Sequence, residues 1–124
     1  MQENKLIDLS FDFAKMIVDL VDSIKFPKSS YMVDQLARAG TSIGANIYEA
    51  QYAHSKADFI AKLEIALKEA NETSYWLKLI FATNRIDEAV YKDADKTCGN
   101  IRRLLIASCN TVKKKQGKGT EKPE

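Results

Sequence analysis

The sequence predicts an all-α fold, an antiparallel up-and-down four-helix bundle, and three observations support this prediction. The 124 residues are 45% hydrophobic, which is enough for one core and one domain. Helix breakers are few, with two prolines and five glycines. Apolar residues recur at the i, i+3, i+4, i+7 spacing of an amphipathic helix, and no segment alternates like a half-buried strand. Because the links between the helical segments are short, neighbouring helices are expected to be antiparallel.

The first predicted helix runs from about Asp8 or Ser10 to Lys25. Pro27 is expected to end it, because a residue that precedes proline is disfavoured in the α conformation. Its buried stripe is expected to consist of Phe13, Ile17, Leu20, Val21 and Ile24.

The second predicted helix begins at an N-cap supplied by Ser29 or Ser30 and reaches about Ala50. A loop over residues 52–54 follows it. The inward-facing residues are expected to be Leu36, Ala39, Ile43 and Ile47.

The third predicted helix opens at Ser55 and reaches about Thr83. Ser55 and Asp58 resemble a capping box, in which a side chain at each position bonds a backbone N–H at the other, with Asp in place of the usual Glu or Gln. The buried face is expected to contain Phe59, Leu63, Ala66, Ala70, Leu77 and Ile80.

The last predicted helix follows a short connection over residues 84–87 and runs from about Glu88 to Lys114. The bundle domain is therefore assigned to residues 1–115, and residues 116–124, which lack an apolar anchor, to a flexible basic tail. The packed positions of this helix are expected to be Ala94, Ile101, Leu104, Leu105, Ser108 and Val112.

No pattern of a catalytic, cofactor or metal site is found in the sequence. His54 is the only histidine and is expected at the surface or beside a helix cap, since a zinc site or a catalytic relay needs partners that it lacks. A di-metal bundle site would need Glu-x-x-His on two helices. The sequence has no nucleophile elbow, phosphate-binding glycine loop or dinucleotide fingerprint. We therefore expect a protein that is not an enzyme and binds no cofactor.

The two cysteines and the apolar runs indicate a cytoplasmic protein. Cys98 and Cys109 lie eleven residues apart on one predicted helix, which separates them by ~16 Å and precludes a disulfide between them. Buried, reduced thiols are expected instead. The longest apolar runs, such as residues 104–107, fall far short of the ~20 residues that span a bilayer, and no signal peptide opens the chain.

Two glycines on the second helix predict close packing. Gly40 and Gly44 share one helical face, and each costs about 1 kcal/mol relative to alanine in a helix interior. Such a pair lets another backbone approach closely, within the bundle or across a subunit contact, and packing is favoured over ligand binding.

Polar side chains form a second stripe on the same helix and leave three interpretations open: a solvated face, a hydrogen-bonded network that orders an interface, and a site for a small ligand or nucleic acid. The interface network is favoured, so replacing Ser42 or Asn46 by alanine is expected to lower stability or assembly. On the third helix, Glu64, Glu69 and Glu72 lie among Lys62, Lys68 and Lys78, which is typical of a solvated face with intrahelical ion pairs. The stripe itself consists of Gln35, Arg38, Ser42, Asn46 and Glu49.

The end of the third helix is apolar on almost every side. Tyr75 and Trp76 are followed by apolar residues as far as Phe81. A helix that is hydrophobic all round is buried on more than one face. Part of this surface is expected to meet another subunit, although the aromatic rings could also cap the bundle.

Residues 35–50, QLARAGTSIGANIYEA, resemble the signature helix of the four-helix bundle protein family, which includes proteins encoded in intervening sequences of bacterial 23S ribosomal RNA genes. Arg-Ala, Ser-Ile and Asn-Ile-x-Glu occur together in the order of that signature. Residues 55–77 are similar to one branch of the family, and the likeness covers about residues 11–108. Ala50 stands where the family usually has a glycine that serves as the helix stop.

The resemblance implies a homopentamer and a family whose biochemical role is poorly defined. Related proteins act as accessory factors of diversity-generating retroelements, where a basic pentamer binds nucleic acid and a reverse transcriptase. Two classes of function follow for this chain. It is a nucleic-acid or ribonucleoprotein accessory factor, or a protein-interaction scaffold without a nucleic-acid role.

The distribution of charge separates these two classes. Residues 113–124 hold five lysines and two glutamates, so that, with a total of +2, the remaining body carries −1. A near-neutral body disfavours tight backbone binding, which needs a basic patch. Binding to RNA or DNA is therefore expected to be weak, independent of sequence and carried by the tail. The candidate nucleic-acid contacts are Arg102, Arg103, Lys113, Lys114 and Lys115.

Overall fold

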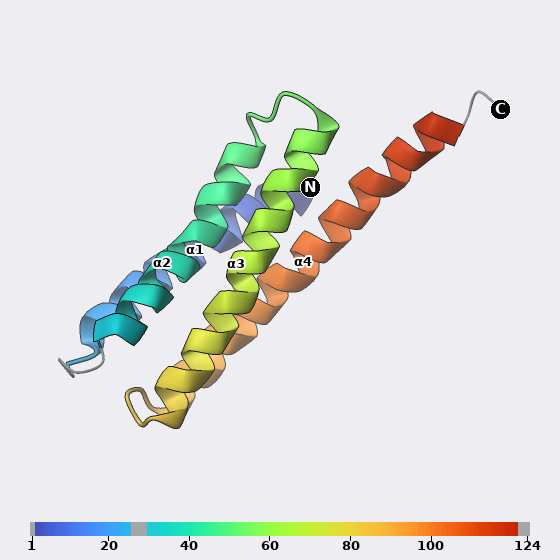
Figure 1. Ribbon diagram of the computed structural model, residues 1–124. Helices are drawn as coiled ribbons and strands as arrows, with labels where there is room; N and C mark the ends of the chain where they lie inside the picture. Colours follow the sequence, from blue (N-terminus) through green and yellow to red (C-terminus); the bar gives the residue numbers. More distant parts are fainter. Residues whose placement is uncertain (1, 26–29, 122–124) are drawn as a thin grey trace.

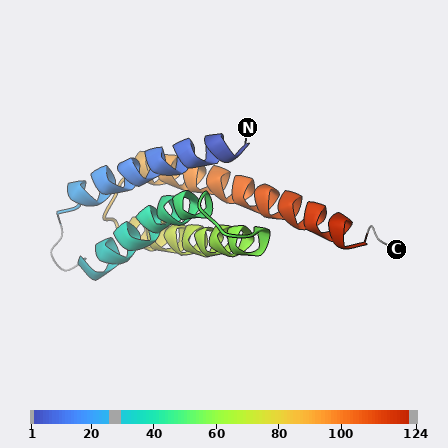
Figure 2. The same ribbon diagram turned by 90° about the horizontal axis from the view of Figure 1, so that it is seen from above.

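Four α-helices make up the part of the protein that the structure describes, and the prediction of an all-α four-helix bundle is confirmed. The computed structural model describes residues 2–25 and 30–121, and within these ranges it contains no strand. Each helix runs antiparallel to its neighbours in the chain (Figures 1 and 2). α1 and α3 each contact both α2 and α4, so the helices occupy the corners of a square. The helices are α1 Gln2–Ser23, α2 Ser30–Ala50, α3 Lys56–Ala82 and α4 Glu88–Glu121.

The core lies along the axis of this square and is filled from all four helices. The four residues predicted to face inward on α2 are all buried, and so are most of those predicted on α3 and α4. Val21 on α1, Ile24 just after it and Phe59 on α3 are only partly buried at the edge of the core. The largest fully buried aliphatic and aromatic side chains are Phe13, Ile17, Leu36, Ile43, Ile47, Leu63, Leu77, Ile80, Ile101 and Leu105.

α1 begins at Gln2, so the predicted start at Asp8 or Ser10 is wrong. Ser10 is 1% exposed in the interior of the helix, where its hydroxyl donates a hydrogen bond to the Ile7 carbonyl at 3.1 Å. Leu6 is also buried and extends the apolar stripe by another turn. α1 ends at Ser23, and the roles predicted for Pro27 and for the side chains of Ser29 and Ser30 fall outside the described residues.

The ends of α3 are fixed by local hydrogen bonds. The Ser55 hydroxyl accepts from the Asp58 backbone N–H at 3.1 Å, as predicted for an N-cap. The Asp58 carboxylate accepts from the backbone N–H of His54 at 3.2 Å, one residue before the position that a capping box would use. At the other end, Asn84 adopts a left-handed φ of 63°, and the Arg85 N–H bonds the Ile80 carbonyl. This is the Schellman arrangement, in which a residue in the left-handed conformation closes the C-terminal end of a helix.

α4 continues to Glu121, well beyond the end predicted at about Lys114, so the helix includes most of the segment assigned to a tail. Gly117 and Gly119 do not stop it, because each costs only about 1 kcal/mol and no competing cap replaces the helical hydrogen bonds. Lysines also suit the C-terminal end of a helix, where the macrodipole is negative. As a result, the C-terminal part of α4 projects beyond the other three helices (Figures 1 and 2).

Candidate functional site

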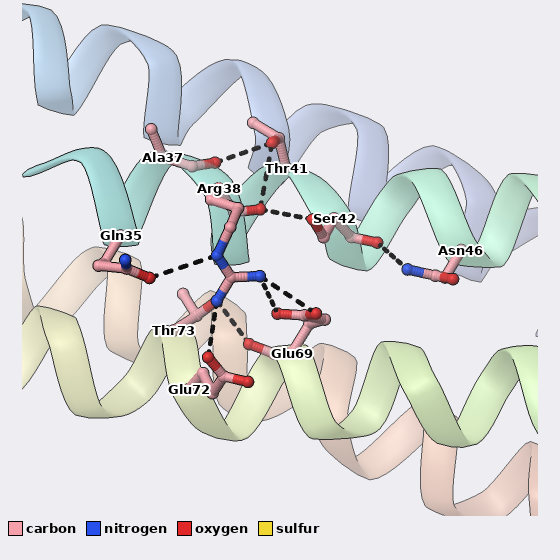
Figure 3. Close-up of polar contacts among 9 residues, drawn as sticks. All are labelled: Gln35, Ala37, Arg38, Thr41, Ser42, Asn46, Glu69, Glu72 and Thr73. Carbon is pink, nitrogen blue, oxygen red and sulfur yellow. Dashed lines mark hydrogen bonds and ion pairs between the residues drawn. The ribbon is translucent and has the colours of Figure 1, made fainter.

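Arg38 is the centre of the polar stripe and connects α2 to α3 (Figure 3). Its Nη1 donates to both carboxylate oxygens of Glu69, at 3.1 and 3.3 Å, and its Nη2 donates to Glu72 at 2.7 Å. Nε donates to the Gln35 side-chain oxygen at 3.3 Å. Desolvation opposes the charge on Arg38, but the two carboxylates outweigh it and raise the pKa of the guanidinium above its usual value.

The rest of the stripe bonds in two other ways. The Ser42 hydroxyl donates to the Arg38 carbonyl at 2.6 Å, and the Asn46 amide donates to the Ser42 carbonyl at 2.9 Å. These two side chains therefore bond the backbone of their own helix (Figure 3). Glu49 forms an ion pair across the helix boundary with Lys62 of α3, at 3.1 Å.

The contact that this network orders lies between two helices of one chain. Intrahelical pairing of the α3 glutamates was predicted and is wrong, because Glu69 and Glu72 pair with Arg38 of α2 and Glu64 pairs with Lys113 of α4. A helix in a square bundle has two neighbouring helices. Charged side chains at either border of its buried stripe therefore face one of these neighbours and can pair with it, instead of pairing within their own helix.

The glycine pair on α2 serves the packing of α1 against α2. A Cβ built at Gly40 would lie 2.9 Å from Ile17 Cγ1, closer than real contacts allow. At Gly44 a Cβ would lie 3.3 Å from the Ser10 carbonyl oxygen. Of the two packing roles predicted for the pair, the structure supports close approach within the bundle.

The aromatic end of α3 is covered by its own chain over most of its circumference, which leaves only part of it for the subunit contact that the sequence predicts. Leu77 is buried, Trp76 is partly buried, and Phe81 stacks on Tyr91 of α4 with ring centroids 4.5 Å apart. Only Tyr75, at 58% exposed, offers a large apolar surface to the outside. The reason is again that α3 packs against both α2 and α4, which buries a wider arc than one stripe.

A second exposed apolar surface, which the sequence reasoning missed, lies between α1 and α2. Here a groove of about 480 Å³ has an almost wholly apolar lining. Phe11 and Tyr48 stand at it, 63% and 60% exposed. The sequence holds a signal for this surface, because Phe11 is a large apolar residue that does not lie on the buried Phe13–Ile17–Leu20 stripe. The other residues at the groove are Ile7, Ser10, Ala14, Thr41, Gly44, Ala45 and Glu49.

The candidate nucleic-acid contacts on α4 differ in their availability. Lys113 is engaged by Glu64 at 2.7 Å, and the hydrogen bond to that carboxylate raises the pKa of the lysine. Lys114 and Lys115 are exposed. Arg102 and Arg103 are exposed as well, and Arg103 donates a hydrogen bond to the side chain of Asn100.

The positive charge of the chain is segregated on α4, from Lys96 onward. From Lys96 to Thr120 the sequence has seven basic residues and no acidic one, which leaves −5 on the rest of the chain. This segregation is not apparent when the net charges of residues 1–112 and 113–124 are summed separately, because Arg102 and Arg103 then count toward a near-neutral body. The macrodipole favours cations only in the last turn of a helix, so it does not account for the basic residues further back.

The remaining candidates for chemistry have structural positions. His54 is exposed beside the N-terminus of α3, as predicted. Cys98 and Cys109 are free, buried thiols, as predicted. Burial raises the pKa of Cys98 to about 12, and the charge of Asp95 adds to this. Across residues 2–25 and 30–121, no three His, Cys, Asp or Glu side chains are placed to hold a metal ion. None of the helices described is long and apolar enough to cross a membrane.

Comparison with known proteins places the chain in a family. A family model described as 23S rRNA-intervening sequence protein matches residues 2–107. A solved structure from Bacteroides thetaiotaomicron VPI-5482, of a protein of unknown function from the S23 ribosomal protein family, is 44% identical. The match covers 89% of this chain and 99% of that one, with a TM-score of 0.81. No curated protein matches. The chain therefore belongs to the 23S rRNA-intervening sequence protein family.

Proposed function

We propose that the protein is a non-enzymatic, homo-oligomeric helical bundle that acts as an accessory factor to a nucleic acid or a ribonucleoprotein in the cytoplasm. The observation that carries this proposal is the segregation of charge on α4, with seven basic residues and no acidic one between Lys96 and Thr120. A basic stripe along one helix is the electrostatic footprint of a protein that binds phosphate backbones.

The position of this stripe adds support. Its C-terminal part belongs to the segment of α4 that projects beyond the bundle (Figures 1 and 2), where a backbone can approach from several sides. In a homo-oligomer, several such segments would act on one nucleic acid, and their linkage would raise the effective concentration of cations around it. Without exposed aromatics among these cations, stacking on bases is not expected, so binding should be independent of sequence.

The test is a titration of labelled structured RNA and duplex DNA at about 50 mM and about 200 mM salt, with the full chain and a variant that ends at Val112. We expect binding at low salt that falls steeply at the higher salt, because each neutralised phosphate releases counterions. The shortened variant should bind more weakly without losing binding altogether, since Lys96, Arg102 and Arg103 remain. If neither protein binds at low salt, the nucleic-acid role is wrong.

The alternative function is a protein-interaction scaffold without a nucleic-acid role. The apolar groove beside Phe11 and Tyr48 favours it, because an exposed apolar surface of this kind marks a contact with another protein. Absence of nucleic-acid binding in the titration, together with a protein that co-purifies in the presence of nuclease, would establish this alternative.

A further inference from the structure

Gly99, in the middle of α4, has no packing reason to be a glycine. A glycine in a helix interior costs about 1 kcal/mol relative to alanine, so it normally has a structural or functional cause. At Gly40 the cause is the contact with Ile17. A Cβ at Gly99 would lie 3.6 Å from Arg103 Nη1, an ordinary contact with a flexible side chain. Packing therefore leaves the glycine at this position unexplained.

The helical neighbours of Gly99 form a ring around it, because residues three and four apart share one face of a helix. The members of this ring are Asp95 and Lys96 on one side and Arg102 and Arg103 on the other. The missing side chain leaves a hollow of about 270 Å³ that these four residues line together with Gly99 itself, Cys98 and Ser74 of α3. At about 30 Å³ for each water molecule, the hollow has room for a tetrahedral anion and several waters.

Three of the four ring members are cations without a carboxylate partner. Among the described residues, no ion pair within 4.0 Å is found for Lys96, Arg102 or Arg103, whereas Arg38 holds two carboxylates. Arg103 bonds only the neutral side chain of Asn100.

The single acid in the ring is turned to another contact. Asp95 accepts a hydrogen bond from the Ser74 hydroxyl of α3 at 3.5 Å, on the side of the hollow that faces the bundle. Asp95 reduces the positive charge of the ring from three to two but leaves the two guanidinium groups unpaired. Guanidinium groups are forked donors that match the oxygens of a phosphate.

We propose that the hollow over Gly99 binds a phosphate group, with Lys96, Arg102 and Arg103 as its ligands, and that this phosphate belongs to a nucleic-acid backbone. The glycine is required because a side chain there would occupy the space of the anion. The assignment of this phosphate to a nucleic-acid backbone rests on the proposed function. Phosphate binding in the hollow rests only on the chemistry of the residues that line it, whatever the source of the phosphate.

The experiment compares four forms of the full chain in binding a labelled single-stranded RNA by fluorescence anisotropy, with salt varied from about 50 to 200 mM. The wild type is compared with Arg102→Gln/Arg103→Gln, with Gly99→Leu, and with a charge-matched control, Lys5→Gln/Lys25→Gln, on exposed lysines of the α1 region. In parallel, the thermal stability of each form is measured with increasing inorganic phosphate. Circular dichroism and light scattering verify that each variant is folded and assembled as the wild type is.

We expect the arginine variant to bind the RNA about tenfold more weakly, with the slope of log K against log salt smaller by about 0.7 to 1.4. The control should change neither quantity by a comparable amount. Gly99→Leu is the decisive variant, because it leaves the charge unchanged and should still weaken binding about as much as the arginine variant. Phosphate should raise the unfolding temperature of the wild type and the control but not of the other two forms.

The possible failures are distinguishable. RNA binding that is unaffected by Gly99→Leu would overturn the hollow as a site while leaving the proposed function intact, since diffuse charge would then suffice. Stabilisation by phosphate that Gly99→Leu abolishes, without any RNA binding, would support the hollow and overturn its nucleic-acid source. If Gly99→Leu instead changes the assembly, Gly99 belongs to a subunit contact and the proposal is wrong. Gly99→Ala, which fits the space at Cβ, provides a second folded variant if the leucine fails to fold.

Discussion

At the scale of single residues, Gly40, Gly44 and Gly99 occupy different environments inside helices, although each has the same cost in helix propensity. Gly40 and Gly44 face a neighbouring helix at contact distance, whereas Gly99 faces an open hollow. The same substitution therefore has opposite consequences at different positions, which makes it a direct test of the packing.

Gly40→Ala is expected to destabilise the protein by about 1 to 3 kcal/mol, because the added methyl group overlaps the stiff, fully buried Ile17 side chain. Gly99→Ala is expected to stabilise it by up to about 1 kcal/mol, from helix propensity alone. Urea unfolding at one fixed protein concentration measures both. If the two variants lose similar stability, Gly40 and Gly99 do not differ in packing.

The Cys98 thiol couples stability to alkaline pH. Burial raises its pKa from 9.0 to about 12, so the unfolded chain loses this proton at lower pH than the folded chain does. Below about pH 9 both states hold the proton and the contribution is constant. Above that, the unfolded state binds fewer protons, and stability falls as the pH rises towards 12.

Between about pH 8 and pH 10.5 this coupling is expected to remove roughly 2 kcal/mol from the free energy of unfolding. Other groups also titrate over this range, so Cys98→Ala is the reference. Over the same pH interval, its free energy of unfolding should fall by roughly 2 kcal/mol less than that of the wild type. Equal losses in the two proteins would show that Cys98 does not carry the effect. The native thiol should also react far more slowly with a disulfide reagent than the unfolded one.

At the scale of helices, the α2–α3 contact is held by one arginine between two carboxylates of unequal exposure. The Glu69 side chain is 13% exposed and that of Glu72 is 36% exposed. Solvent weakens the attraction between charges less where it is excluded. The pair of Arg38 with Glu69 should therefore contribute more to the stability of the fold than the pair of Arg38 with Glu72 does.

Glu69→Gln is expected to cost about 1 kcal/mol of stability and Glu72→Gln a few tenths. The effect of Glu69→Gln should shrink in high salt, because salt screens the wild-type pair. Lys15→Met provides the control, since the Lys15–Asp12 pair is fully on the surface and should contribute little. A loss from Lys15→Met equal to that from Glu69→Gln would contradict this ranking.

The helices and their inward faces could be predicted from the sequence, because apolar periodicity and the signals at Ser55 and Asn84 are local. Helix ends without such a signal could not. α1 starts earlier than predicted because Ser10, an N-cap residue by type, is accommodated inside the helix by a bond to the Ile7 carbonyl. α4 continues because two glycines in a lysine-rich segment weaken a helix without ending it.

The candidate site was predictable only in its residues, and its pairings were not. Gln35, Arg38 and Glu49 were found as one stripe, but the partners of Arg38 and Glu49 on α3 depend on how far each helix is rotated about its axis. That rotation is set by contacts such as Gly40 against Ile17, which no local pattern reveals. The hollow at Gly99 could not be predicted either, because the sequence does not distinguish a glycine that faces a neighbouring helix from one that faces a hollow.

At the scale of the whole molecule, the basic residues concentrated on α4 and the exposed aromatic side chains lie on different elements. The basic part of α4, from Lys96 to Thr120, belongs to a chain that is otherwise acidic. The exposed aromatic side chains lie elsewhere: Tyr31 and Tyr52 near the two ends of α2, Phe11 and Tyr48 over the α1–α2 groove, and Tyr75 on α3. α1 and α3 occupy opposite corners of the square, so the apolar surfaces at the groove and at Tyr75 face in different directions.

Two different apolar surfaces on one protomer are what a closed ring requires, because each subunit must present one surface to each neighbour. We expect a ring of five copies, as the family resemblance implies, in which Tyr75 of one copy packs into the α1–α2 groove of the next. Light scattering should then give about 70 kDa, five times the 14.0 kDa of the protomer.

Phe11→Asp and Tyr75→Asp should each break the ring, whereas Val90→Asp, at an exposed site away from both surfaces, should not. Mixing the first two variants is the sharpest test, because each retains the surface that the other has lost. A head-to-tail contact predicts heterodimers that cannot close, while a monomer mass for the wild type, or a mixture that stays monomeric, would contradict it.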